Sequence, residues 1–304
     1  MQEPSDRSSP KDLLGPMRLP FLILAPACVV LGVGTAVWAQ GQINVFHAIL
    51  AFVGAIAAHI SVNVLNEYFD YRSGLDFKTE RTPFSGGSGT LPAKPEMARS
   101  ALITGLVASV LTGLIGLYFL TIWGLGLLPL GILGLIVILT YTSWITRYPL
   151  LCLLAPGLGF GTFVVMGTDY VLTGCYSWTA FFASLVPFFL VNDLLLLNQF
   201  PDVEADASTG RRHFPIVIGR QASSVIYIAF LALTYLSIIV GVGLGTLPAA
   251  SLLGLITLLL AVPVSIGAYR YAENLEKLMP YLGLNILLVV ATPILVAIGL
   301  FIAS

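Results

Sequence analysis

Two polar segments interrupt an otherwise apolar sequence, and both combine carboxylates with asparagine at regular spacing. In the first segment, Asn66 is followed four residues later by Asp70. In the second, Asn198 is followed at the same interval by Asp202 and then by Asp206. Residues four apart on a helix share one face, so each set can direct its oxygens at a common point. Such oxygens suit hard cations, and Mg²⁺ is held by a few carboxylates together with substrate phosphates. The spacing therefore predicts a magnesium site.

Helix geometry and neighbouring charges extend this prediction. The first segment continues a polar stripe with steps of four, three and four residues, which is one face of a helix. This stripe comprises His59, Asn63, Asn66 and Asp70. The second set shares a face if its helix continues past Pro201, or else Pro201 starts a new helical segment. Basic residues follow both segments and can take up phosphate charge, arginine in bidentate fashion. These are Arg72, Lys78, Arg81, Arg211 and Arg212.

The composition places these segments in a membrane protein. Of the 304 residues, 57% are hydrophobic and 10% are charged. Soluble domains carry about 25% charged residues, so the composition excludes a water-soluble globule. Apolar stretches of about 20 residues recur, which is the length that crosses a hydrocarbon core as a helix. Nine such stretches are expected, at residues 19–39, 43–69, 100–121, 124–144, 150–172, 178–200, 224–245, 249–269 and 280–302.

The placement of charge predicts the orientation of these helices. All 14 lysine and arginine residues precede the first stretch or fall in every second connection. The positive-inside rule makes that side cytoplasmic, with the N-terminus inside and the C-terminus outside. We expect a multi-pass protein of a prokaryotic plasma membrane, with an active site open to the cytoplasm. Residues 1–16 are expected to be a disordered cytoplasmic tail, and residues 17–304 a single transmembrane domain. The net charge of −1 gives no indication of nucleic-acid binding, and no obligate protein partner is evident.

The two polar segments also indicate an internal repeat. Each ends an apolar stretch that arrives from the outside, and the two stretches lie four spans apart. This arrangement predicts two parallel half-bundles of about four helices around a central cavity, with the ninth helix added. The expected fold is therefore an all-α integral membrane bundle of about nine helices.

At these residues the sequence resembles the UbiA superfamily of intramembrane prenyltransferases. That family has two aspartate-rich motifs, at the cytoplasmic ends of the second and sixth helices of a nine-helix bundle. The second motif, D-x-x-x-D, is matched at Asp202 and Asp206. The resemblance extends over nearly the whole chain and includes the trailing Gly210, Arg211 and Arg212.

The first motif departs from the family pattern N-D-x-x-D-x-x-x-D. Asn66 and Asp70 are kept, but Glu67 takes the second position. Gly74 stands where the last aspartate is expected, and Asp76 follows two residues later. This displaced spacing resembles the naphthoate prenyltransferases of menaquinone synthesis.

The resemblance implies roles for individual residues, with Asp70 and Asp202 as the catalytic pair. The implied metal ligands are Asn66, Asp70, Asp76, Asn198, Asp202 and Asp206. Arg147 joins the basic residues listed above as a diphosphate-binding residue. In the expected substrate pocket, Arg18 and Tyr141 resemble positions that line such sites, His59 and Asn63 come from the polar stripe, and Tyr68 is expected to offer an aromatic face to a carbocation.

The implied reaction is magnesium-dependent transfer of a prenyl chain from a prenyl diphosphate to an aromatic acceptor, such as the quinone precursor 1,4-dihydroxy-2-naphthoate. Another acceptor remains open, whether a different aromatic acid, a tetrapyrrole or a glycerol phosphate. A cation-coupled transporter is the alternative from another class, although transporters bind near the bilayer midplane. Asp193 lies inside the sixth stretch on the opposite helix face from Asp202, and no role is assigned to it.

Overall fold

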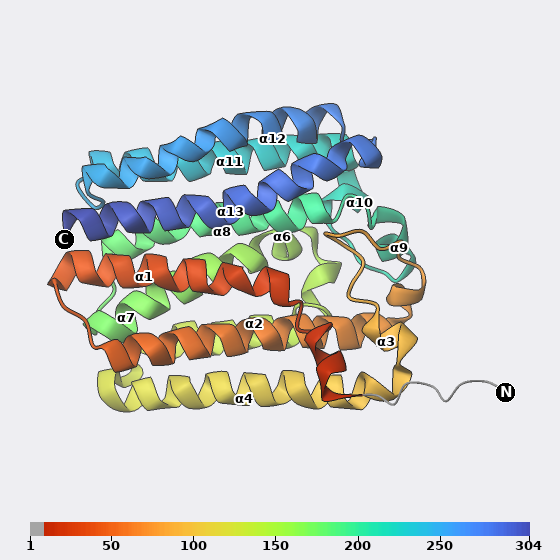
Figure 1. The fold of residues 1–304 in the computed structure, drawn as a ribbon, viewed down its shortest axis with the longest axis horizontal. Helices are drawn as coiled ribbons and strands as arrows, with labels where there is room; N and C mark the ends of the chain where they lie inside the picture. The colour runs from red at the N-terminus through yellow and green to blue at the C-terminus, as the bar shows by residue number, and fades with distance from the viewer. Residues whose placement is uncertain (1–8) are drawn as a thin grey trace.

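The computed structural model describes residues 9–304, and this part of the chain is a bundle of helices without strands (Figure 1). The α-helices are α1 (Leu24–Gln40), α2 (Val45–Ser73), α3 (Thr90–Ala93), α4 (Ala98–Trp123), α5 (Leu128–Thr140), α6 (Pro149–Gly157), α7 (Gly167–Thr173), α8 (Trp178–Asn198), α9 (Val203–Ser208), α10 (Phe214–Ile218), α11 (Arg220–Gly243), α12 (Leu258–Arg270) and α13 (Leu275–Ala303). A π-helix, η7 (Leu158–Met166), joins α6 to α7. The 3-10 helices are η1 (Pro10–Leu14), η2 (Leu19–Ile23), η3 (Leu75–Phe77), η4 (Pro95–Met97), η5 (Gly124–Leu127), η6 (Ile145–Arg147) and η8 (Ala249–Thr257).

Eight segments of the described residues are long and apolar enough to cross a membrane. One of them, Pro95–Thr140, has 46 residues and is broken at Gly124, whose φ is 72°. The Trp123 indole before this break donates to the Val171 carbonyl at 2.9 Å, at one end of the bundle. Thr142, just after α5, accepts from Asn66 at the other end, so α4 and α5 each cross the bundle. Counting them separately gives nine helical passages in residues 9–304, as the sequence predicted.

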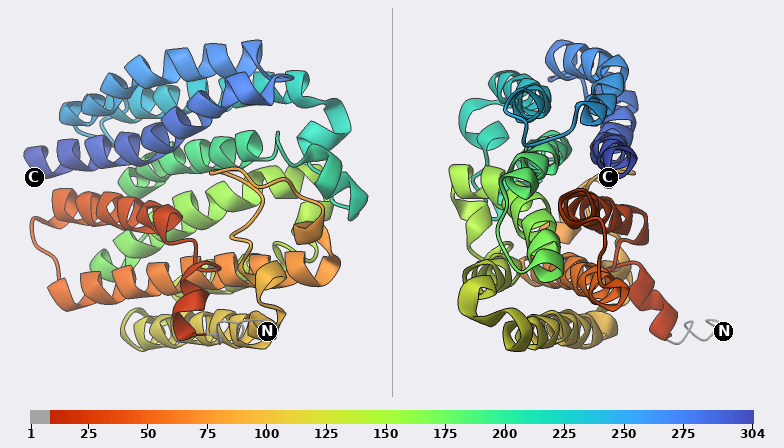
Figure 2. Two further views of the ribbon diagram at one scale, coloured as in Figure 1. Left: turned by 45° about the vertical axis from the view of Figure 1, so that its right-hand side comes forward. Right: turned by 90° about the vertical axis from the view of Figure 1, so that its left-hand side faces the viewer.

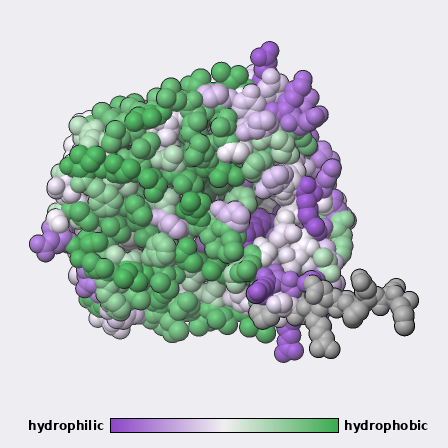
Figure 3. Space-filling view, in the orientation of Figure 1, coloured by the Kyte–Doolittle hydropathy of each residue, from purple (hydrophilic) through white to green (hydrophobic). Residues whose placement is uncertain are grey.

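The two ends of the bundle differ in polarity. The helices α2 and α8, which carry the polar segments, finish at the same end, and all lysines and arginines of residues 9–304 lie at that end. Figure 3 shows apolar residues over most of one face and hydrophilic residues gathered at this end. We call it the site end. The opposite end holds the C-terminus (Figure 2). The polarity agrees with a bundle that sits in a bilayer.

The N-terminal segment differs in part from the predicted disordered tail over residues 1–16. Residues 1–8 lie outside the described residues. The next residues form η1, because the Ser9 side chain caps the helix by accepting from the Lys11 N–H. In return, the Asp12 carboxylate accepts from the Ser9 N–H at 2.7 Å. Lys94 holds η1 against the start of α4 through an ion pair with Asp12 at 2.9 Å.

The helices form two halves with the segment α6–η7–α7 between them (Figures 1 and 2). The first half pairs α2 with α4, and the second groups α8 with α11, α12 and α13. The largest buried apolar cluster belongs mainly to the second half and extends to α1. The expected arrangement of two half-bundles is confirmed.

Three cysteines, Cys28, Cys152 and Cys175, are free thiols.

The π-helix η7 follows a local disturbance of the backbone ladder. Pro156 has no N–H to donate, and the N–H of Gly157 bonds to the Asn192 side chain of α8 at 2.6 Å. A proline and a competing side-chain acceptor are recognised causes of such widening. One turn later, Gly161 has its backbone against Phe188 of α8. The second glycine lets η7 and α8 approach closely while the wide turns direct Phe160 and Phe163 to the other side.

Gly161 and Gly159 provide a matched test of this packing. A Cβ at position 161 would lie 2.6 Å from the Phe188 Cα, whereas a Cβ at position 159 would have no atom within 4 Å. We expect Gly161→Ala to destabilise the protein by roughly 1–3 kcal/mol, since backbone atoms must move. Gly159→Ala is expected to leave stability unchanged or slightly raised, because alanine favours helix. The measurement is the unfolding midpoint in detergent at a fixed heating rate. Equal midpoints for the two variants would contradict the packing described.

Candidate active site

Arg211 joins the two polar segments at the site end. Its guanidinium donates to Asp206 Oδ1 at 3.0 Å and contacts Asp70 Oδ1, so one cation lies between an aspartate of each motif. His213 Nε2 lies 2.9 Å from the other oxygen of Asp206. The expectation that both motifs meet at one place is therefore met in the structure by a shared arginine.

The second motif is divided between two helices. Helix α8 ends at Asn198, and α9 begins at Val203 with Asp202 as its N-cap. The single continuous helix considered from the sequence is thus wrong, because Pro201 lacks an N–H and disfavours the helical conformation of the residue before it. The Asp206 N–H still bonds to the Asp202 carbonyl at 2.8 Å, so these two residues remain one helical turn apart.

Several buried oxygens at this place have no hydrogen-bond partner within residues 9–304. They are Asp76 Oδ2, Asn198 Oδ1 and Asp202 Oδ1. A buried acceptor without a partner is costly, so such oxygens suit a bound cation. No group of three or more His, Cys, Asp or Glu side chains in the described residues is placed so as to hold a metal ion. The unpartnered oxygens of two carboxylates and one amide are nevertheless donors of the kind that Mg²⁺ prefers, and Mg²⁺ commonly takes its further ligands from a substrate.

The pKa values of Asp202 and Asp76, the two carboxyl groups with unpartnered oxygens at the site, are raised. Burial raises the pKa of Asp202 to about 7, and the charge of Asp206 adds to this shift. Burial also raises the pKa of Asp76 to about 7, with contributions from the Glu67 and Asp70 charges. A cation bound here would displace protons from these groups, because metal ligands must be deprotonated.

Glu67, at the unusual second position of the first motif, serves as an anchor for other segments. Its carboxylate accepts from Arg18 Nε at 2.9 Å and from the Ser88 backbone N–H at 2.7 Å. The Ser88 hydroxyl donates to its second oxygen at 2.9 Å. Both carboxylate oxygens are thus occupied, and Glu67 ties η2 and the loop before α3 to α2.

The predicted basic residues occupy different positions around the site. Lys78 donates to the Ser208 hydroxyl at 3.2 Å and so spans from the first motif to α9. The Arg81 guanidinium lies against Gly89. The others, apart from Arg211, have exposed side chains at the rim of the site end, and these are Arg72, Arg147 and Arg212.

A cavity of about 670 Å³ extends from the site end into the bundle. Of the predicted pocket residues, four line it: Arg18, His59, Asn63 and Tyr141. Tyr68 does not belong to the lining and packs edge-on against Phe69, because it lies on a different face of α2 from the polar stripe. Asn66 and Asn198 line the cavity at its polar end.

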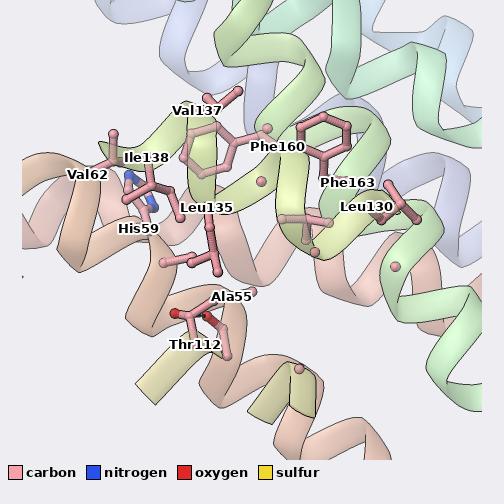
Figure 4. Close-up of a pocket in the computed structure, with 18 of the residues that line it drawn as sticks. Ala55, His59, Val62, Thr112, Leu130, Leu135, Val137, Ile138, Phe160 and Phe163 are labelled. Carbon is pink, nitrogen blue, oxygen red and sulfur yellow. Dashed lines mark hydrogen bonds between the residues drawn. The ribbon is translucent and has the colours of Figure 1, made fainter. Parts of the chain in front are cut away.

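The rest of the cavity wall is apolar. Figure 4 shows Phe160 and Phe163 of η7 facing residues of α2 and α5, with His59 near Val62 and Ile138. The His59 ring meets Phe160 edge-on at 4.6 Å, and its Nδ1 has no partner in the described residues. The α4 and α5 side is open outward, because lining residues there are about half exposed. These are Leu114, Leu117 and Ile132.

Sequence reasoning missed two parts of this site. The aromatic wall from η7 has no sequence signal beyond an apolar run, since a π-helix cannot be read from periodicity. The loop Ser85–Gly89 was visible as a run of three glycines and two serines, a composition typical of anion-binding turns. Asp193, to which the sequence assigned no role, is fully buried in α8 and does not line the cavity.

Two relatives of known activity align with somewhat more than 70% of this chain. The 1,4-dihydroxy-2-naphthoate octaprenyltransferase of Haemophilus influenzae is 28% identical over 71% of this chain and 73% of its own. The digeranylgeranylglyceryl phosphate synthase of Thermococcus kodakarensis is 26% identical over 72% of this chain and 77% of its own.

Solved structures share the fold over almost the whole chain. The apo structure of a UbiA homolog from Aeropyrum pernix K1 superposes with a TM-score of 0.69 at 20% identity, covering 94% of this chain and 98% of that one. A UbiA homolog from Archaeoglobus fulgidus bound to GPP and Mg²⁺ gives 0.59 at 13% identity, covering 94% and 99%. The UbiA prenyltransferase family itself matches residues 25–289, and this chain therefore belongs to that family.

Proposed function

We propose that this protein transfers a prenyl chain from a prenyl diphosphate to a small aromatic acceptor with the help of Mg²⁺. The first candidate for this acceptor is 1,4-dihydroxy-2-naphthoate. The observation that carries the proposal is the junction of two environments. Arg18, Asn66 and Asn198 line the polar end of a long apolar cavity, and the motif segments that continue from the two asparagines carry the buried, unpartnered oxygens of Asp76 and Asp202. A prenyl diphosphate has the same division into a charged head and an apolar chain.

The residues that would hold Mg²⁺ are the carboxylate and amide residues of the two motif segments, of which Asp76, Asn198 and Asp202 have an unpartnered oxygen and Asp70 and Asp206 are paired with Arg211. They are Asn66, Asp70, Asp76, Asn198, Asp202 and Asp206. A magnesium ion held there would supply neutralisation of the diphosphate charge as the leaving group departs. Arg211 keeps Asp70 and Asp206 oriented, and Lys78 and the rim arginines add positive charge for the departing diphosphate.

The cavity suits the carbocation character of such a reaction. Water would capture an allylic cation, so the reacting carbon needs a dry environment with aromatic faces. Phe84, Tyr141 and Phe160 line the cavity within the bundle and can supply these faces. The apolar wall beyond them provides room for the isoprenoid chain.

The acceptor is assigned from relatives and from the polar atoms of the wall. Naphthoate octaprenyltransferases are among the relatives, and the motif spacing also points to them. Asn63 and His59 are polar residues of the cavity wall, as are Thr112 and Thr168, and can hydrogen-bond the substituents of an aromatic ring. Glycerol phosphate is the second candidate acceptor, because two relatives are named digeranylgeranylglyceryl phosphate synthases.

The orientation in the membrane follows from charge. Since all lysines and arginines of the described residues lie at the site end, the positive-inside rule favours a cytoplasmic position for that end. We infer that the N-terminus is cytoplasmic, the C-terminus is outside and the diphosphate reaches the site from the cytoplasmic face. The transporter alternative has no support, because both motifs lie at one end of the bundle rather than at mid-depth.

Amide substitutions of the aspartates test the reaction. We expect Asp70→Asn and Asp202→Asn each to lower prenyl transfer by on the order of 100-fold or more. The reason is that each variant loses a carboxylate charge that would hold Mg²⁺ next to the diphosphate leaving group. Glu204→Gln is the matched control: it is also acidic, it lies on α9 between Asp202 and Asp206, and its exposed side chain pairs with Arg220. The measurement is the magnesium-dependent formation of prenylated dihydroxynaphthoate by protein in lipid nanodiscs.

Each outcome of this assay has a distinct meaning. Diphosphate release without prenylated naphthoate would retain the ionising site and assign another acceptor, with glycerol phosphate to be tried next. Transfer that persists in chelator, or in both aspartate variants, would refute the proposed role of the two motifs.

The ion pairs of Arg211 allow a separate prediction on stability. Arg211→Met leaves Asp70 and Asp206 as buried like charges, and breaking a buried ion pair costs about 3 kcal/mol or more. Arg212→Met is the control, because that side chain is exposed and only its backbone N–H is engaged, with the Thr146 carbonyl. We expect a much lower unfolding midpoint for the first variant only. Similar midpoints for both would show that Arg211 does not stabilise the junction of the motifs.

A further inference from the structure

The loop Ser85–Gly89, between η3 and α3, lies next to acidic residues of the first motif segment. Ser88 bonds to Glu67 through its N–H at 2.7 Å and its hydroxyl at 2.9 Å. The Ser85 hydroxyl lies close enough to Asp202 to lower the pKa of that carboxyl in opposition to burial. Phe84, the residue before the loop, lines the cavity. The loop is therefore fixed between the apolar wall and the carboxylates.

Glycine is required at three positions of this loop. Gly86, Gly87 and Gly89 have φ of 83°, 72° and 74°, a region that side chains disfavour. Gly87 is also the closest to the acidic groups, because a Cβ there would lie 3.2 Å from Asp76 Oδ1 and 3.2 Å from Glu67 Oε1. The backbone at Gly87 thus lies next to the carboxylates of Asp76 and Glu67, with little room for a side chain between them.

The backbone N–H groups of the loop divide into two sets. Those of Ser85, Ser88 and Thr90 are engaged, with the Thr82 hydroxyl, with Glu67 and with the Ser88 hydroxyl respectively. Those of the three glycines have no acceptor among residues 9–304. The free N–H groups of Gly86 and Gly87 are consecutive, and consecutive backbone N–H groups in a turn can form a concave anion site.

We propose that the N–H groups of Gly86, Gly87 and Gly89 bind the diphosphate of the donor beside the metal oxygens of Asp76 and Asp202. This inference rests on the proposed function and assigns it a further binding element. Three neutral donors can hydrogen-bond phosphate oxygens without bringing another cation next to Mg²⁺. The bonds of Ser88 to Glu67 act as the positioning contacts that hold these donors in place.

The test compares two glycines with the same backbone strain. Gly87→Ala forces a positive φ on alanine within the loop, and Gly41→Ala does so at the far end, where φ is 71° and no atom lies within 4 Å of the new Cβ. The measurement is the affinity of each variant for inorganic diphosphate with Mg²⁺, together with the KM values for geranylgeranyl diphosphate and for the acceptor. We expect Gly87→Ala to weaken diphosphate binding and to raise the donor KM by roughly tenfold to a hundredfold, the range for hydrogen bonds to charged groups. The acceptor KM and all values of Gly41→Ala should remain near those of the wild type.

A backbone substitution separates the N–H from the geometry of the loop. Glycolic acid at position 87, introduced as an α-hydroxy acid during cell-free synthesis, replaces the N–H by an ester oxygen and adds no side chain. The same replacement at position 41 is the control. A loss of diphosphate affinity at position 87 alone supports the inference.

The opposing results are equally specific. Unchanged diphosphate affinity in both position-87 variants would overturn the inference and leave the proposed function standing. An equal rise of donor and acceptor KM with a lower unfolding midpoint would overturn it as well, since the loop would then be only a structural support. Wild-type protein that binds no diphosphate with Mg²⁺ would refute the proposed function itself.

Discussion

The neutralisation of buried acidic groups is the constraint on which this bundle depends. Two carboxylates cannot lie close together in a medium of low dielectric constant without a cation, because their repulsion and desolvation are both costly. Arg211 supplies that cation between Asp70 and Asp206. It thereby connects the end of α2 with the segment after α8 and sets where the two halves of the molecule meet. The loops around it are arranged to complete the same charge balance, as Glu67 does with Arg18.

Local periodicity made part of this predictable from the sequence. The stripe from His59 to Asp70 lies on one continuous helix, so spacing alone placed His59, Asn63 and Asn66 on the cavity wall. The alternation of basic and neutral connections gave the number and direction of the helices, because each passage reverses the side on which the chain emerges. The parallel repeat followed from the same regularity.

Other features depend on partners distant in sequence and could not be read locally. The attachment of Ser88 to Glu67 spans 21 residues, and that of Arg211 to Asp70 spans 141. The end of α8 before Pro201 was one of two options until tertiary contacts selected it. Tyr68 was assigned to the pocket by its aromatic character, although its position on α2 directs it elsewhere. The π-helix depends on Asn192, which no pattern around Pro156 reveals.

The open side of the cavity between α4 and α5 changes what substrate concentration means for this protein. Leu114, Leu117 and Ile132 belong both to the cavity wall and to the outer surface of the bundle. For the proposed donor, the chain can enter sideways from the bilayer, so occupancy follows its mole fraction among the lipids and not its molarity in the cytoplasm. Diluting the protein with additional lipid at constant volume would then slow the reaction, a form of surface dilution that a site reached only through water would not show.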